Sequence, residues 1–286
     1  MREVVQKPIP PKSLSFLYTT RFGGLILRIM NRRWISKLAG RYLDGRLSRR
    51  KIKKYIEKNG IDMSQYLDED YKSFNAFFTR RIKPELRPFD REPSSLISPC
   101  DGKLSAYKIT DGLTFNVKGF DYTVESLLKN AELAQEFAGG TALVFRLCVT
   151  DYHRYFFFDG GNAHSNTFIK GRLHTVQPIA LENRRVFTEN CREYTVLDTD
   201  NFGKAVMVEV GAMMVGRIVN KVKSGRFERG DEKGMFEFGG STVIVLLKKD
   251  AAIVDDEFFV NTQNDCETVV KCGEKIGESG VEQIIT

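Results

Sequence analysis

The sequence predicts an α+β protein in which a helical N-terminal region precedes an antiparallel, β-rich core. Two observations carry this prediction. Residues 13–58 place apolar side chains at near-helical spacing among many basic ones, whereas the chain after residue 93 has short runs of Val, Ile, Phe and Tyr separated by Gly, Asp and Asn turns. We therefore expect residues 1–72 to form the helical region and residues 73–286 to form the β-rich domain.

The composition is that of a folded protein with a hydrophobic core of its own. The chain has 286 residues, of which 42% are hydrophobic and 11% aromatic. Its mean hydropathy of −0.30 excludes a bundle of membrane-spanning helices. The five cysteines are scattered and lack the spacing of a zinc site, so we expect reduced thiols and no bound metal.

Basic charge is concentrated at the N-terminus. The first 60 residues contain 16 Lys and Arg and three acidic residues, whereas the other 226 contain 28 basic and 34 acidic residues. Between residues 13 and 43 apolar side chains, Trp34 among them, alternate with arginines as in an amphipathic helix, and Arg21 and Arg28 interrupt any membrane span or signal peptide. We expect this region to lie on an anionic membrane surface. The alternative is that its helices pack on the core with their arginines in solvent.

Nucleic acid is not an expected partner of this basic region. The chain has no recognisable helix-turn-helix, zinc-finger or RNP motif to accompany the basic residues.

The individual elements follow from local patterns. A short helix is expected over residues 73–82, with Ser73 as its N-cap, and a longer helix over residues 125–137. Strands rich in β-branched and aromatic residues are expected over residues 104–109, 142–149, 154–158, 194–199, 205–211, 213–222, 241–249 and 267–271.

A few polar residues are candidates for chemistry. His153 lies in the segment DYHRYF and His174 in GRLHTV, and a histidine can act as a general base near neutral pH. Asp101 lies in SPCDGKL, where the Asp-Gly pair by itself indicates only a β-turn.

The segment FEFGGSTVIVLL has two interpretations. Gly239 and Gly240 can form a tight turn that leads into a buried strand. Alternatively, the Ser241 hydroxyl attacks the preceding glycine carbonyl, and this N-to-O acyl shift followed by elimination cuts the chain and leaves a pyruvoyl group. That reaction needs a general base and a carboxylate to orient it.

Five motifs occur together in a fixed order: SFNAFFTRRIKP, SPCDGKL, DYHRY, VEVGAMMVGRI and FEFGGST. With them the chain resembles the bacterial phosphatidylserine decarboxylase family from about Ser73 to the C-terminal KCGEKIG. The resemblance implies a proenzyme that cuts itself between Gly240 and Ser241, giving a β chain of residues 1–240 and an α chain of residues 241–286 that begins with a pyruvoyl group derived from Ser241. It also implies that Asp101 and Ser241 belong to the self-cleavage triad and that His153 acts near the substrate.

One position departs from the family pattern. Many members carry a second histidine three residues after the first, as the base for self-cleavage, and this chain has Phe156 there. A phenylalanine cannot accept a proton. Either His153 serves both reactions or another group replaces the missing base, and His174 is the candidate for that group.

The resemblance also implies the reaction and its setting. The amine of phosphatidylserine would form a Schiff base with the pyruvoyl group, and loss of CO2 would give phosphatidylethanolamine with no added cofactor. The enzyme is expected to be a homodimer of cleaved protomers, peripheral on the cytoplasmic face of the cell membrane.

Other functions remain open at this point. They are a pyruvoyl-dependent decarboxylase of a soluble amino acid and an uncleaved, non-catalytic membrane-binding protein. A serine hydrolase is disfavoured because Ser241 lacks the G-x-S-x-G elbow.

Overall fold

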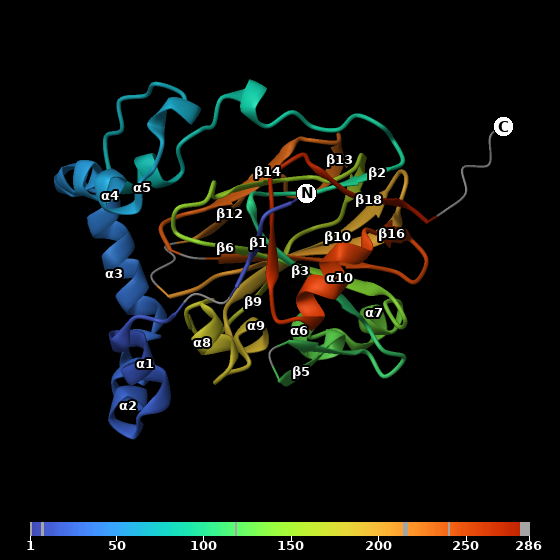
Figure 1. Ribbon diagram of the computed structural model, residues 1–286, viewed down its shortest axis with the longest axis horizontal. Helices are drawn as coiled ribbons and strands as arrows, with labels where there is room; N and C mark the ends of the chain where they lie inside the picture. The colour runs from blue at the N-terminus through green and yellow to red at the C-terminus, as the bar shows by residue number, and fades with distance from the viewer. Residues whose placement is uncertain (1, 7–8, 118, 214–216, 240, 281–286) are drawn as a thin grey trace.

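The computed structural model describes residues 2–6, 9–117, 119–213, 217–239 and 241–280. It confirms the predicted α+β class, with a large antiparallel sheet at the centre of the core and the helices of the first 60 residues standing to one side (Figure 1).

The largest sheet in the described part of the chain has ten strands, and neighbours along its path are antiparallel. The strand that begins at Ser241 lies in its interior, paired on both sides. The order is β1 (Val4–Val5), β17 (Glu267–Val270), β3 (Gly102–Lys108), β6 (Thr141–Leu147), β15 (Ser241–Leu247), β11 (Gly203–Val210), β10 (Arg192–Thr199), β8 (Gly161–Ala163) and β13 (Gly225–Phe227), and β9 (Thr167–Ile169) also pairs with β10.

Both faces of this sheet are covered, which is why its central strands are apolar on both sides. Val144 and Ile244 belong to the core on one face, and Phe145 and Val245 to the core on the other. The first face is covered by the hairpin β4 (Thr114–Val117) and β5 (Phe120–Thr123) and by α6 (Val124–Leu128), α7 (Ala131–Gln135), α8 (Pro178–Leu181) and α9 (Val186–Glu189). The second face is covered by two three-stranded sheets and by α10 (Asp256–Gln263). One sheet has the order β12 (Ile218–Asn220), β14 (Glu232–Phe236) and β7 (Arg154–Phe156). The other has the order β16 (Ala252–Val254), β18 (Lys275–Ser279) and β2 (Ser95–Ile97).

Most of the predicted strands are confirmed. The segments 104–109, 142–149, 194–199, 205–211, 241–249 and 267–271 correspond to β3, β6, β10, β11, β15 and β17, and 154–158 to the shorter β7. Within 213–222 the structure has the strand β12, and residues 214–216 lie outside the described residues.

The helix predicted over residues 73–82 is confirmed as the shorter α5 (Phe74–Phe78), and the Ser73 hydroxyl caps it by accepting the Ala76 N–H at 3.2 Å. The single helix predicted over residues 125–137 is wrong, because two helices, α6 and α7, form there. Lys129 adopts a left-handed φ of 54°, which ends α6, and the Asn130 side chain then caps α7.

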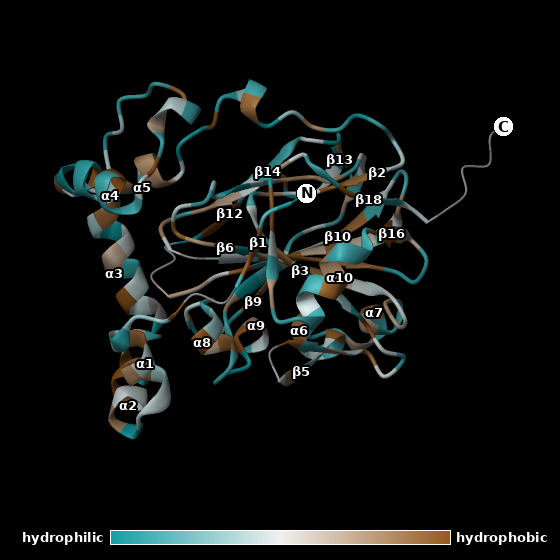
Figure 2. Ribbon diagram, in the orientation of Figure 1, coloured by the Kyte–Doolittle hydropathy of each residue, from teal (hydrophilic) through white to brown (hydrophobic). Residues whose placement is uncertain are grey.

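The first 60 residues form an arm, defined here as α1 (Lys12–Thr19), α2 (Arg21–Met30), α3 (Arg33–Asp44) and α4 (Ile52–Asn59). Tyr18 and Leu27 join the apolar core of the first sheet face, so the arm is anchored near its start. Brown and teal residues alternate along α3 in Figure 2, as in an amphipathic helix. None of the helices that the structure describes is long and apolar enough to cross a bilayer.

A buried ion pair joins the large sheet to the small sheet that covers its second face. Lys233 of β14 contacts Glu209 of β11 at 2.9 Å, and both side chains are fully buried. Asn220 of β12 accepts a hydrogen bond from Lys233 at 2.9 Å and donates one to Glu209 at 3.1 Å. Burial raises the pKa of the Glu209 carboxyl, and the Lys233 ammonium opposes that shift. Removal of either Lys233 or Glu209 alone would therefore leave the other side chain buried without its partner charge.

We expect Lys233→Met to lower the free energy of unfolding by about 3 to 5 kcal/mol, because it leaves the Glu209 carboxylate buried without its cation. The double variant Lys233→Met with Glu209→Leu is expected to recover most of this loss. Chemical denaturation measures both. Arg226→Met is the control, since Arg226 binds Asp200 through an exposed pair and its loss is expected to change nothing measurable. Equal effects of Lys233→Met and Arg226→Met would contradict the prediction.

Candidate active site

The strand registers bring two of the predicted site residues to the same end of the large sheet. Arg146 of β6 pairs with Lys103 of β3 on one side and with Thr242 of β15 on the other. Asp101 immediately precedes β3, and Ser241 is the first residue of β15 and pairs with Leu147 of β6. The two residues therefore lie at one end of the sheet with a single strand between them.

Ser241 is enclosed at this end. Its side chain is fully buried, and its Oγ has no hydrogen-bond partner among the described residues. A buried hydroxyl without a partner is costly, which makes it a mark of a functional position. Gly239 has a φ of 134°, a conformation open to glycine. Gly240, the other residue of the predicted cleavage site, lies outside the described residues.

His153 is held in the form that a general base requires. Its Nδ1 lies 2.8 Å from the backbone oxygen of Asp151, and because a carbonyl only accepts, Nδ1 carries the proton. Nε2 is then the basic nitrogen, and it has no partner in the described part of the chain. Burial lowers the pKa of His153 to about 4, so the ring is neutral at pH 7.

The segment that leads into Ser241 is attached directly to His153. The Phe236 N–H donates to the His153 carbonyl at 2.9 Å. Two residues later the Phe238 ring packs against Phe78 of α5, and the Phe78 ring centroid is 4.1 Å from that of His153. The short helix α5 thus supports both the histidine and the chain that approaches Ser241.

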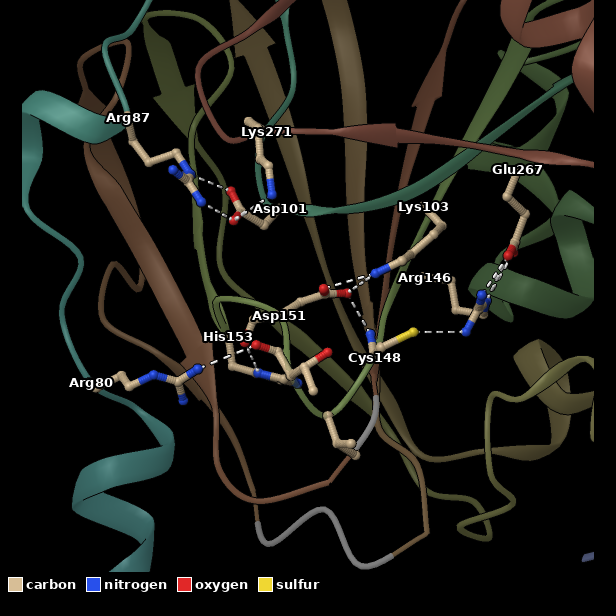
Figure 3. Close-up of polar contacts among 12 residues, drawn as sticks. Arg80, Arg87, Asp101, Lys103, Arg146, Cys148, Asp151, His153, Glu267 and Lys271 are labelled. Carbon is tan, nitrogen blue, oxygen red and sulfur yellow. Dashed lines mark hydrogen bonds and ion pairs between the residues drawn. The ribbon is translucent and has the colours of Figure 1, made fainter. Parts of the chain in front are cut away.

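Asp101 is held by a different set of partners. Its carboxylate accepts two hydrogen bonds from Arg87, at 2.8 and 2.6 Å (Figure 3). It also accepts one from the Cys272 N–H at 2.9 Å. Among the described residues its hydrogen bonds do not include His153 or Ser241. Sequence reasoning missed Arg87, because an arginine in the loop KPELRP has no pattern that separates it from a solvated one.

A second ion pair fixes the loop that carries His153. Lys103 donates to both carboxylate oxygens of Asp151 at 2.8 Å, and the Cys148 N–H donates to the same carboxylate at 2.7 Å. In Figure 3 this cluster lies between Asp101 and His153. The backbone oxygen that orients His153 is therefore held in place by the side chain of its own residue.

Arg80 is a further residue that sequence reasoning missed. Its side chain is buried, stacks on Tyr66 and donates to the Thr150 carbonyl at 3.2 Å, one residue before the carbonyl that binds His153. Its Nε and Nη1 have no hydrogen-bond partner among the described residues. The positive charge of Arg80 adds to burial in lowering the pKa of His153.

His174 lies where the arm meets the core. Its Nδ1 is 2.9 Å from the Asn31 side chain and 3.3 Å from the Tyr18 hydroxyl, and its Nε2 is 3.3 Å from a carboxylate oxygen of Glu189. The hydrogen bonds of its ring join α1 and α2 to α9 and do not reach Ser241 within the described chain. Its role as the self-cleavage base stays a prediction.

A backbone hydrogen bond holds Phe156 next to the segment that contains Asp101. Its N–H donates to the Pro99 carbonyl at 2.8 Å, and its ring packs against Phe89 and Tyr152. An aromatic cluster therefore occupies the position where many family members are expected to carry their second histidine.

Comparisons with known proteins place the chain in one family. The profile of the phosphatidylserine decarboxylase family matches residues 74–278. The chain is 45% identical over 268 residues to phosphatidylserine decarboxylase proenzyme 2 of Clostridium acetobutylicum, covering 93% of this chain and 91% of the relative. It is 42% identical over 270 residues to the phosphatidylserine decarboxylase proenzyme of Ruminiclostridium cellulolyticum, covering 92% and 90%. The chain belongs to the phosphatidylserine decarboxylase family.

Proposed function

We propose that the chain is a phosphatidylserine decarboxylase proenzyme that cleaves itself between Gly240 and Ser241. The observation that carries this proposal is the buried Ser241 Oγ without a hydrogen-bond partner, at the sheet end to which the neutral His153 is also attached. Family membership supports the same reaction, since the relatives named above are proenzymes.

The self-cleavage uses groups of the chain alone. Nε2 of His153 takes the Ser241 hydroxyl proton while Oγ attacks the Gly240 carbonyl carbon, so an ester bond forms and the peptide C–N bond breaks. Removal of the Ser241 Cα proton then expels the Gly240 carboxylate and leaves dehydroalanine. Addition of water and loss of ammonia convert this residue to the pyruvoyl group, giving a β chain of residues 1–240 and an α chain of residues 241–286.

The surroundings of residue 241 suit such a group. Ser241 is fully buried and lies opposite the apolar Leu147 of β6. The pyruvoyl group supplies an electrophilic carbonyl for the amine of phosphatidylserine, the chemistry that loss of CO2 requires. His153, neutral at pH 7, takes up at Nε2 a proton that the substrate ammonium releases as its amine reacts, and returns this proton to the substrate α-carbon after CO2 has left. The mature enzyme is proposed to be a homodimer of cleaved protomers.

Intact-mass spectrometry under denaturing conditions is expected to find two chains, one of them the 46-residue fragment 241–286 with a pyruvoyl group in place of its first residue. Ser241→Ala is expected to remain a single chain, because it has no hydroxyl to attack the peptide bond. Thr242→Val is the matched control, since Thr242 Oγ1 is also buried without a partner in the described residues but does not adjoin the scissile bond. Cleavage of Ser241→Ala, or an uncut parent chain, would overturn the proposal.

The identity of the base is a separate prediction. The geometry supports His153, because its Nε2 is unoccupied within the described chain, whereas both ring nitrogens of His174 have partners. We expect His153→Ala to stay uncleaved and His174→Ala to mature, as judged by the 46-residue fragment. The opposite pattern would make His174 the base that replaces the histidine missing at Phe156.

The arm is proposed to hold the enzyme on the cytoplasmic face of an anionic membrane. It carries large apolar side chains in solvent, among them Phe22 at 66% exposure, Leu25 at 55%, Trp34 at 54% and Leu38 at 53%. The excess basic charge of the chain lies wholly within its first 60 residues, to which the arm belongs. Exposed apolar residues beside cations are what binding to an anionic lipid surface requires.

Vesicle co-sedimentation tests this placement. The double variant Leu25→Ser with Ile29→Ser, one turn apart on α2, is expected to reduce binding to phosphatidylserine-containing vesicles at least about tenfold, because two apolar side chains no longer enter the lipid. Ile253→Ser with Val260→Ser is the matched control, since both residues are exposed on the core. If the two double variants lose binding equally, the arm is not the membrane-binding surface.

A further inference from the structure

A cavity of about 560 Å³ separates α3 of the arm from the core. Ser36 lies on its arm side, and Gly211 and Glu237 lie on its core side. Gly211 follows Val210, which pairs with Thr242, so Gly211 is level with Ser241 on the neighbouring strand. Glu237 is four residues before Ser241 in the chain. The cavity therefore adjoins the end of the sheet where the candidate active site lies.

The helix α3 presents three different surfaces around its axis. At 100° per residue, Ser36 and Gly40 share one side, which lines the cavity. Trp34, Leu38 and Tyr42 form an exposed apolar stripe on another side. Lys37 and Arg41 lie between these two sides and also line the cavity.

On the arm side of the cavity, one hydroxyl and two cations are unpaired among the described residues. Ser36 is 3% exposed, and its Oγ has no hydrogen-bond partner among the described residues. Lys37 and Arg41 likewise form no ion pair with a described side chain. A buried hydroxyl without a partner, beside two free cations and open space, is the arrangement that an anionic ligand would satisfy.

The acidic groups of the cavity, in contrast, already have partners. Glu237 accepts two hydrogen bonds from Arg217, at 2.9 and 2.8 Å. Asp44 accepts one from Asn75 at 2.8 Å. Glu193, the third carboxylate of the lining, accepts one from Asn220 at 2.9 Å. Arg217 thus neutralises Glu237, whereas Asp44 and Glu193 have amide donors. Lys37 and Arg41 are the lining cations without a paired carboxylate among the described residues.

We propose that this cavity is the headgroup subsite for a glycerophospholipid, in which Ser36, Lys37 and Arg41 bind the phosphodiester. This inference rests on the proposed function and specifies how its substrate is held. The apolar stripe of Trp34, Leu38 and Tyr42 follows the acyl chains, and the serine part of the headgroup extends toward residue 241. The volume is in the range of cavities that hold small ligands.

The test measures binding in a chain that cannot mature. Full-length Ser241→Ala is titrated calorimetrically with dihexanoyl phosphatidylserine below its micelle-forming concentration, so that neither a membrane nor the pyruvoyl group takes part. Adding Lys37→Gln and Arg41→Gln is expected to raise the dissociation constant about tenfold or more, because two charge-assisted contacts with phosphate are lost. Lys54→Gln with Lys58→Gln on α4 is the matched control, an exposed pair of the same spacing outside the cavity, and is expected to stay within about twofold.

The outcomes separate this inference from the proposed function. A Ser241→Ala chain that binds no dihexanoyl phosphatidylserine, or a Lys37 and Arg41 variant that binds it as well as its parent, overturns the subsite even if the parent enzyme cleaves itself and releases CO2. Failure of self-cleavage overturns the proposed function and leaves the binding result standing. Ser36→Ala provides a second variant with little effect on folding, and it is expected to weaken binding without shifting the unfolding temperature.

Discussion

The position of β15 inside the large sheet is the constraint on which the rest of the structure depends. All seven of its residues are buried, and it pairs with β6 on one side and β11 on the other. A break before Ser241 would therefore leave the new chain start held by two complete ladders. Contacts elsewhere add to this hold, since Glu267 forms a buried ion pair with Arg146 and the Cys272 N–H binds Asp101. The fold is compatible with losing the peptide bond that precedes β15.

The charged groups around the site keep His153 neutral and pair the carboxylates of Asp101 and Asp151 with basic side chains. His153 is oriented by a backbone carbonyl, and burial together with Arg80 lowers its pKa to about 4. Asp101 is neutralised by Arg87. Phe156 lies in the aromatic cluster with Phe89 and Tyr152, and the charged partner that the structure gives Asp101 is Arg87. Through Arg87 and the Cys272 N–H, the Asp101 carboxylate joins the turn before β3 to two other segments, and its role in self-cleavage stays a prediction.

The central strands could be predicted from the sequence because both faces of the sheet are buried. Such strands appear as continuous apolar runs, as in residues 142–149 and 241–249. It does not predict the break at Lys129, since a left-handed residue there depends on packing rather than on residue type. The motifs predict Asp101, His153 and Ser241 as site residues. They do not predict Arg87, whose contact with Asp101 comes from the path of a loop across the core.

The arm belongs to the basic N-terminal region of the chain and forms one side of the cavity beside the candidate site. Tyr18 and Asn31 bind His174, which anchors α1 and α2 beside α9 and so sets where α3 can lie. From that position α3 turns its apolar stripe outward and its hydroxyl and cations toward the cavity beside the sheet end. A basic helix that only attached the protein to lipid would have no reason to bury Ser36 without a partner. On the proposed function, the excess positive charge of the first 60 residues would both meet an anionic surface and guide one of its lipids toward the cavity.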